Sequence, residues 1–180
     1  MRTNALEEHY ATKEFLNGPG GWLASRPGIA EPISDLGAGR IAAMDDAGVD
    51  LAVLSLAAPG VEQLDGPEAV RLARKCNDEL ATAVGRDPGR LAGFAALPTG
   101  APEEAAAELD RTVRGHGFVG AVINGHSHGR YLDDPFFDPV LSQAAALTVP
   151  IYLHPTIPPA GVIESSYAGF ADEVTFTLAT

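Results

Sequence analysis

The sequence has few of the features that tie a protein to a membrane, to nucleic acid or to an oxidising compartment. Its single cysteine, Cys76, cannot form an internal disulfide, so a reducing cytoplasm is the expected location. No apolar run approaches the roughly twenty residues that a membrane span needs, and no signal-peptide core follows Arg2. Twelve basic residues against twenty-four acidic ones give a formal charge of −12, which opposes binding to a phosphate backbone. We therefore expect a soluble cytoplasmic protein whose partners include neither nucleic acid nor a membrane.

The residues that are present suit a single folded domain. A chain of 180 residues with 46% hydrophobic content can bury a sizeable core, and no second domain is visible. Apolar runs alternate with segments of helical spacing, which predicts βα units and a parallel sheet. Strands are expected at about 4–9, 50–56, 91–96, 118–123 and 149–154, with helices at about 35–47, 67–86, 102–116 and 135–147. A long loop is expected over 17–32.

Five such units fit an open doubly wound sheet or part of an eight-stranded (β/α)8 barrel of the TIM type. The positions of polar residues favour the barrel. Glu7, His9, Asn124 and His154 fall at the carboxyl ends of their strands, which is the rim where βα barrels hold their catalytic groups. Strands one and five also converge on one site more readily when the sheet is curled.

A split metal site is the chemistry that these residues suggest. Residues two apart on a strand share a face, so Glu7 and His9 point into one cavity while Glu8 points away. One carboxylate oxygen and imidazole nitrogens suit a divalent ion such as zinc, manganese or iron. His154 joins them only if the two strand ends meet in space.

Five linked segments carry a family resemblance over nearly the whole chain. They are Ala5-Leu6-Glu7-Glu8-His9, Asn77-Asp78, the run from Arg90 to Pro98, the run from Gly117 to Gly125, and Tyr152-Leu153-His154-Pro155. Together they resemble the amidohydrolase-related metal-dependent decarboxylases, the family of gamma-resorcylate decarboxylase and aminocarboxymuconate semialdehyde decarboxylase. Their order and separations make the set more specific than any one segment.

The resemblance implies a (β/α)8 barrel of which residues 1–180 form the N-terminal part, with about the first five βα units. It implies one divalent ion, zinc or manganese, bound by Glu7, His9 and His154. The implied activity is nonoxidative decarboxylation of a small aromatic or unsaturated carboxylic acid, by a protein that forms homo-oligomers. Relatives take a catalytic histidine from after strand six and a metal-binding aspartate from after strand eight. No residue up to Thr180 matches either, so the acid is expected outside this chain.

Two other functions stay open. Related barrels use the same ions to activate water, so a metal-dependent hydrolase is the alternative enzyme. Most such hydrolases have His-x-His after strand one, whereas this chain has Glu7-Glu8-His9. The other alternative is a noncatalytic, truncated barrel whose exposed edges bind a partner chain.

Other candidate residues have weaker support. Asn124 is expected either to bind substrate or to cap its loop. Trp22 is a candidate lid over the substrate or a plug at the barrel rim. His126 and His128 alternate like metal ligands but are expected to be solvent-exposed in a polar loop. Tyr152 is expected to serve packing rather than chemistry.

Overall fold

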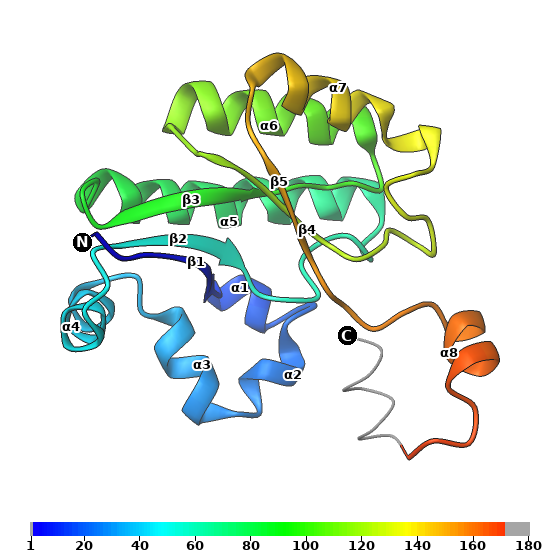
Figure 1. The fold of residues 1–180 in the computed structure, drawn as a ribbon, viewed down its shortest axis with the longest axis horizontal. Coiled ribbons are helices and arrows are strands. Elements are labelled where there is room, and N and C mark those ends of the chain that lie inside the picture. Colours follow the sequence, from blue (N-terminus) through cyan, green and yellow to red (C-terminus); the bar gives the residue numbers. More distant parts are fainter. Residues whose placement is uncertain (1, 172–180) are drawn as a thin grey trace.

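The computed structural model describes residues 2–171, which contain five parallel strands and the helices that connect them (Figure 1). The strands are β1 (Asn4–Tyr10), β2 (Leu51–Leu56), β3 (Leu91–Ala96), β4 (Gly120–Asn124) and β5 (Ile151–His154). They lie side by side in chain order, and every neighbouring pair is parallel. A doubly wound sheet instead reverses its strand order at a switch point. The sequential order confirms the prediction of a partial barrel.

The four longer helices begin and end where the sequence predicts a change of backbone geometry. They are α4 (Ala38–Ala47), α5 (Gly66–Arg86), α6 (Pro102–His116) and α7 (Asp138–Leu147), and the 3₁₀ turn η1 (Pro135–Phe137) leads into α7. Proline occupies the first turn of α5 and α6, where no N–H is needed. Gly48 and Gly117 end α4 and α6 with φ of 69° and 70°, the left-handed conformation that glycine adopts without strain.

The prediction of a long loop over 17–32 is wrong. This region contains α2 (Gly21–Ala24) and most of α3 (Pro27–Ser34), and α1 (Lys13–Leu16) precedes it. The hydroxyl of Thr12 caps α1 by accepting from the Phe15 N–H at 3.1 Å. Four-residue helices show no periodicity, so they escape a pattern-based prediction. The helix predicted at about 35–47 begins three residues later, with Gly37 as the N-cap of α4 and Asp35 Oδ1 accepting from the Gly37 N–H at 2.6 Å.

The core is split between the two faces of the sheet. The larger part lies between the strands and helices and includes Leu54, Leu72, Leu80, Leu109 and Ile123. The smaller part, formed by Val53, Phe94 and Val122, lies on the opposite face, the interior side of the curled sheet. Beyond this small cluster, toward the carboxyl ends of the strands, the interior face becomes polar. Parallel registers put His9 beside Ser55 and Asn124 beside His154.

The strands at the two edges of the sheet are less covered than the central ones. In Figure 1, α6 and α7 lie above the strands, α1 to α4 lie below β1, and α8 (Ala160–Ser166) lies apart near the C-terminal end. Leu6 on β1 and Leu153 on β5 are 52% and 63% exposed. Within residues 2–171, no helix has both the length and the apolar composition needed to cross a bilayer.

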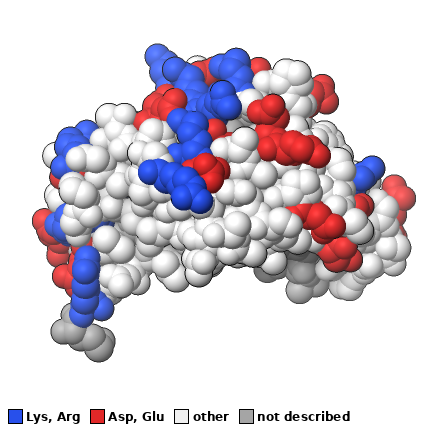
Figure 2. Space-filling view, turned by 90° about the horizontal axis from the view of Figure 1, so that it is seen from above, with Lys and Arg blue, Asp and Glu red and all other residues white. Residues whose placement is uncertain are grey.

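Charged side chains on the face seen in Figure 2 form mixed groups, with acidic and basic residues next to one another. A groove of about 620 Å³ runs along α5 and is lined in part by Arg71, Arg74 and Lys75. Arg71 and Lys75 both pair with Glu14, and Arg74 pairs with Glu108. The basic side chains of this groove therefore already have carboxylate partners.

Candidate metal centre

Three potential metal ligands from the two edge strands meet at the carboxyl end of the sheet. One ligand atom each from Glu7, His9 and His154 lies within 4.8 Å of the other two. The closest carboxylate–imidazole approach is 3.5 Å, between Glu7 Oε1 and His154 Nε2, and the two imidazole rings meet edge to face with centroids 4.9 Å apart. The curled sheet thus brings together the three residues that the sequence predicts as ligands.

The hydrogen bond of His154 Nδ1 leaves its other ring nitrogen, Nε2, available to a cation at this point. Its Nδ1 lies 2.7 Å from the carbonyl oxygen of Pro155, which only accepts, so Nδ1 carries the proton. In the neutral ring, Nε2 then presents a lone pair toward the Glu7 carboxylate. Two electron-rich atoms facing one another are stabilised by a positive ion between them. Two imidazoles and a carboxylate form a donor set that zinc and manganese accept.

His9 is held in place from two sides. Its Nδ1 lies 3.1 Å from Ser55 Oγ on the neighbouring strand, which leaves Nε2 free, and its backbone carbonyl accepts from Arg40 Nη2 at 2.8 Å. Burial lowers the pKa of His9 below its usual 6.5, and His154 lowers it further. A lowered pKa keeps the imidazole neutral at neutral pH, which is the state that binds a metal.

Tyr152 does more than the packing role predicted for it. Its ring stacks on Phe94, with centroids 5.9 Å apart, and its hydroxyl also donates to Glu7 Oε2 at 2.8 Å. This bond raises the pKa of Tyr152 and orients the Glu7 carboxylate. The signal was available, because Tyr152 lies two residues before His154 and shares its face of β5.

Asn124 lies beside His154 in the sheet, whereas Trp22 lies on α2. Asn124 is 1% exposed and pairs in register with His154, so its side chain faces the same interior. Its partner is Glu62, a buried residue of the loop after β2 that sequence reasoning missed. Trp22 is on α2, 45% exposed, with the Arg26 guanidinium 5.0 Å from its ring centroid. Its role as a lid stays a prediction.

The prediction that His126 is exposed is wrong, whereas His128 is exposed as expected. His126 is 9% exposed; its Nδ1 accepts from the Gly129 N–H at 3.0 Å and its Nε2 donates to the Ile157 carbonyl at 3.1 Å. Nδ1 thus closes a turn within its own loop, and Nε2 joins that loop to the segment after β5. The burial comes from residues distant in sequence, which a local pattern does not reveal.

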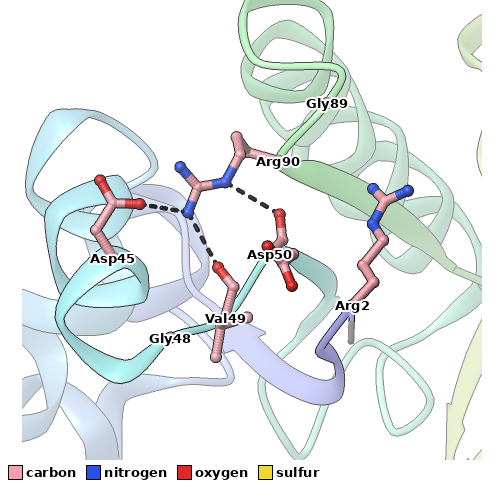
Figure 3. A pocket seen from close by; sticks show the side chains of 7 residues that line it. All are labelled: Arg2, Asp45, Gly48, Val49, Asp50, Gly89 and Arg90. Carbon is pink, nitrogen blue, oxygen red and sulfur yellow. Dashed lines mark hydrogen bonds and ion pairs between the residues drawn. The ribbon is translucent and has the colours of Figure 1, made fainter.

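A separate cavity of about 440 Å³ lies at the amino-terminal ends of β2 and β3, far from the carboxyl-terminal rim (Figure 3). Arg90 extends across it, donates to the backbone carbonyls of Asp50 and Val49 at 3.0 Å each, and pairs with Asp45 at 2.7 Å. These contacts fix the turn between α4 and β2. In βα barrels this end serves stability, and the catalytic groups lie at the other end.

Comparisons with known proteins identify the family of this chain. The amidohydrolase family model matches residues 9–179. The decarboxylase orsB of Emericella nidulans is 41% identical over 97% of this chain and 53% of its own length. Gamma-resorcylate decarboxylase of Polaromonas sp. is also 41% identical, over 86% of this chain and 50% of its own length. The chain thus spans about half the length of these curated relatives.

A solved structure gives the same fold. It is 5-carboxyvanillate decarboxylase from Novosphingobium aromaticivorans, complexed with manganese and 4-hydroxy-3-methoxy-5-nitrobenzoic acid. The match has a TM-score of 0.87 at 34% identity and covers 99% of this chain and 58% of that one. The sequence match over most of the chain and the shared arrangement of strands both point to the same family. The chain belongs to the amidohydrolase family and is related to its gamma-resorcylate decarboxylases.

Proposed function

We propose that this protein is a metal-dependent nonoxidative decarboxylase of a small aromatic carboxylic acid, and that residues 1–180 supply most of its metal ligands. The observation that carries the proposal is the convergence of Glu7, His9 and His154 at one rim of the sheet. Similarity to aromatic acid decarboxylases supports the choice of reaction. Those relatives are about twice as long as this chain. We therefore propose the activity for the whole protein and not for residues 1–180 alone.

The proposed reaction breaks the bond between the ring and the carboxylate. The electron pair of that bond remains on the ring carbon, which then takes a proton, and carbon dioxide leaves. A divalent ion held by Glu7, His9 and His154 would supply positive charge that fixes the carboxylate and an adjacent hydroxyl group of the substrate. Ser55 orients His9 and Tyr152 orients Glu7 through hydrogen bonds. Such bonds to the ligands raise the metal affinity of a site.

Manganese is the ion that we favour over zinc. The related 5-carboxyvanillate decarboxylase was solved with manganese. A carboxylate with two imidazoles accepts either ion, so the donor set alone leaves the choice open. The family resemblance implies that the proton donor and a fourth metal ligand come from the part of the relatives that has no counterpart in residues 1–180.

Metal titration of the purified chain tests the proposal most directly. We expect about one manganese ion per chain by calorimetry and elemental analysis. His9→Ala and His154→Ala should each weaken manganese binding by about a hundredfold or more, since mutating residues that only hydrogen-bond to metal ligands already costs up to that much affinity. His128→Ala is the matched control, because His128 is exposed and outside the ligand group. Equal manganese binding by wild type and both ligand variants would contradict the proposal.

Binding of 2,6-dihydroxybenzoate to the manganese-loaded chain is the second readout. We expect measurable binding that disappears when the metal is removed by a chelator. Carbon dioxide release by residues 1–180 alone is not expected, because the acid is assigned outside them. Metal-dependent turnover by this chain would correct that assignment while supporting the reaction class.

The uncovered sheet edges favour a second candidate, a noncatalytic barrel that binds a partner chain. Leu6 and Leu153 lie on the edge strands β1 and β5 with more than half of their surface exposed. Exposed strand edges are sites of association. Manganese binding without affinity for 2,6-dihydroxybenzoate, together with a dimeric or larger mass in light scattering, would favour this candidate.

A further inference from the structure

Glu62 is a buried carboxyl group at the rim of the sheet, and its hydrogen bonds to Asn124 use only one of its two oxygens. It lies in the loop after β2 and is 2% exposed. Oε1 accepts from the backbone N–H of Asn124 at 2.7 Å and from Asn124 Nδ2 at 3.1 Å. Oε2 is buried with no hydrogen-bond partner among the described residues. Burying a carboxyl oxygen without a hydrogen-bond partner lowers the stability of the folded protein, so such a group calls for an explanation.

The contact with Glu62 decides which way the side-chain amide of Asn124 points. A carboxylate accepts hydrogen bonds, so the NH₂ end of the amide must face it. The carbonyl oxygen of the amide, Oδ1, is thereby turned away from Glu62. Oδ1 is also buried and has no partner within residues 2–171. A buried acceptor of known orientation is therefore present on the interior face, in register with His154.

The backbone around Glu62 is shaped to allow this arrangement. Gly60 has a φ of +66°, and a Cβ at this position would lie 2.1 Å from Glu62 Oε2 and 2.5 Å from Asn124 Nδ2. Only glycine leaves room for both side chains there. The loop from β2 and the end of β4 thus fit together closely around the Glu62–Asn124 contact.

We propose that Glu62 is a positioning residue that holds the Asn124 amide so that Oδ1 accepts a hydrogen bond from a hydroxyl group of the bound aromatic acid. This inference rests on the proposed function, because it places the acid beside His154. It goes further by naming a chemical requirement. The site selects ring substituents that donate a hydrogen bond over substituents of similar size that cannot donate.

The test compares two ligands on the intact, manganese-loaded chain. These are 2,6-dihydroxybenzoate, whose hydroxyl groups donate, and 2,6-difluorobenzoate, whose fluorine atoms do not. The readout is the ratio of their dissociation constants, because effects common to both ligands cancel in it. We expect Glu62→Leu to reduce the preference for the hydroxyl compound by about five- to tenfold, as expected for a lost hydrogen bond to a buried group. Asn124→Ala should reduce it equally, and the double variant no further.

Two further variants separate positioning from folding. Glu62→Gln keeps an oxygen that accepts from the Asn124 amide, so the ligand preference should stay within about twofold of wild type. Glu108→Gln is the matched control, because Glu108 is 1% exposed and binds an asparagine, Asn77, on the helical side of the fold. It should leave the preference unchanged. An unchanged preference in a folded Glu62→Leu protein would overturn the proposal.

A measurement without ligand keeps the two proposals distinguishable. The side-chain NH₂ signals of Asn124, assigned by their absence in Asn124→Ala, should shift in Glu62→Leu in nitrogen–proton correlation spectra. In the unmutated chain they should also move as Glu62 titrates, since burial raises its pKa to about 7. If neither benzoate binds but these signals behave as described, the proposed function fails and the positioning stands. If the signals respond to neither change, the positioning itself is wrong.

Discussion

Two buried glutamates each bind an asparagine side chain in this molecule, and they differ in what else surrounds them. Glu108 on α6 accepts from Asn77 Nδ2 at 2.8 Å and from two nitrogens of Arg111 at 2.7 and 2.8 Å, so both of its oxygens are used. Asn77 in turn bonds both backbone groups of Ala96 at 2.9 Å. The Glu62–Asn124 pair includes no cation among the described residues, and one oxygen of each of its two side chains lacks a hydrogen-bond partner there.

The difference between these pairs separates stability from binding. A buried polar group whose bonds are all made holds the protein together and has nothing left to offer a ligand. The Glu108–Asn77 pair joins α5, α6 and β3 in this way. The Glu62–Asn124 pair gives up some stability and retains an acceptor at the rim, as functional sites commonly do. The remaining predictions test this contrast, beginning with the largest expected effect.

The same substitution at both glutamates should have unequal effects on stability. Glu108→Leu removes the bonds that Glu108 accepts from Arg111 and Asn77 in a buried position, so the free energy of unfolding should fall by about 3 kcal/mol. Glu62→Leu also removes an unpaired buried oxygen, so its loss should be about 1 kcal/mol or less. Urea unfolding at neutral pH measures both. Equal losses at the two positions would show that the distinction is wrong.

The pH dependence of stability should change in Glu62→Gln. Burial raises the pKa of Glu62 from 4.5 to about 7, so the folded protein binds this proton more tightly than the unfolded chain does. The stability that protonated Glu62 contributes is present below pH 4.5 and is lost as the pH rises through 7. Glutamine cannot ionise. Relative to wild type, Glu62→Gln should therefore gain about 2 to 3 kcal/mol between pH 4.5 and pH 8, since one pKa unit corresponds to about 1.4 kcal/mol.

Denaturant midpoints at several pH values measure this gain as a difference between the two proteins, so that all other titrations cancel. Glu108→Gln serves again as the control, because Glu108 is equally buried but pairs with the Arg111 guanidinium. A constant difference between wild type and Glu62→Gln across this pH range would mean that Glu62 ionises in the folded protein as readily as in the unfolded chain.

The smallest expected effect concerns Ser55, which contacts His9 at the rim. Ser55→Ala removes the hydroxyl that orients the His9 ring, so manganese affinity should fall about tenfold. The unfolding free energy of the metal-free protein should change by about 1 kcal/mol or less. Ser34→Ala, which removes a hydroxyl bonded to the Ala30 carbonyl on α3, should leave manganese affinity unaltered. A larger loss of stability than of affinity in Ser55→Ala would assign Ser55 to the fold instead.

The sequence allows the sheet and the convergence of Glu7, His9 and His154 to be predicted because both depend on the local strand pattern and the order of the βα units. Alternation along a strand puts Glu7 and His9 on one face, and the order of the βα units puts β1 and β5 at the edges of a curled sheet. The structure brings these residues and His154 together as expected. The family resemblance then supplies the chemistry, and the comparisons confirm the relationship.

Glu62 and His126 could not be predicted, because their surroundings come from distant parts of the chain. Glu62 reads as an ordinary charged loop residue, and only its approach to Asn124, 62 positions away, shows that it is buried. His126 is covered in the same way by a contact with Ile157. Ser55 is a hydroxyl residue within the apolar run of β2, and this exception to the pattern is only a weak indication of a role at the rim. Local pattern indicates which face a strand residue takes, but it does not indicate which loops meet at the rim.

The position of Glu7 and His9 on β1 and of His154 on β5, the two edge strands of the described sheet, has a mechanical consequence. An ion shared by Glu7 and His154 would connect the two edges of the sheet and act as a cross-link that holds its curvature. Binding and curvature are then coupled, so that any change which flattens the sheet weakens the site and any bound ion resists flattening. At a metal concentration a thousand times the dissociation constant, such a link adds about 4 kcal/mol to the free energy of unfolding.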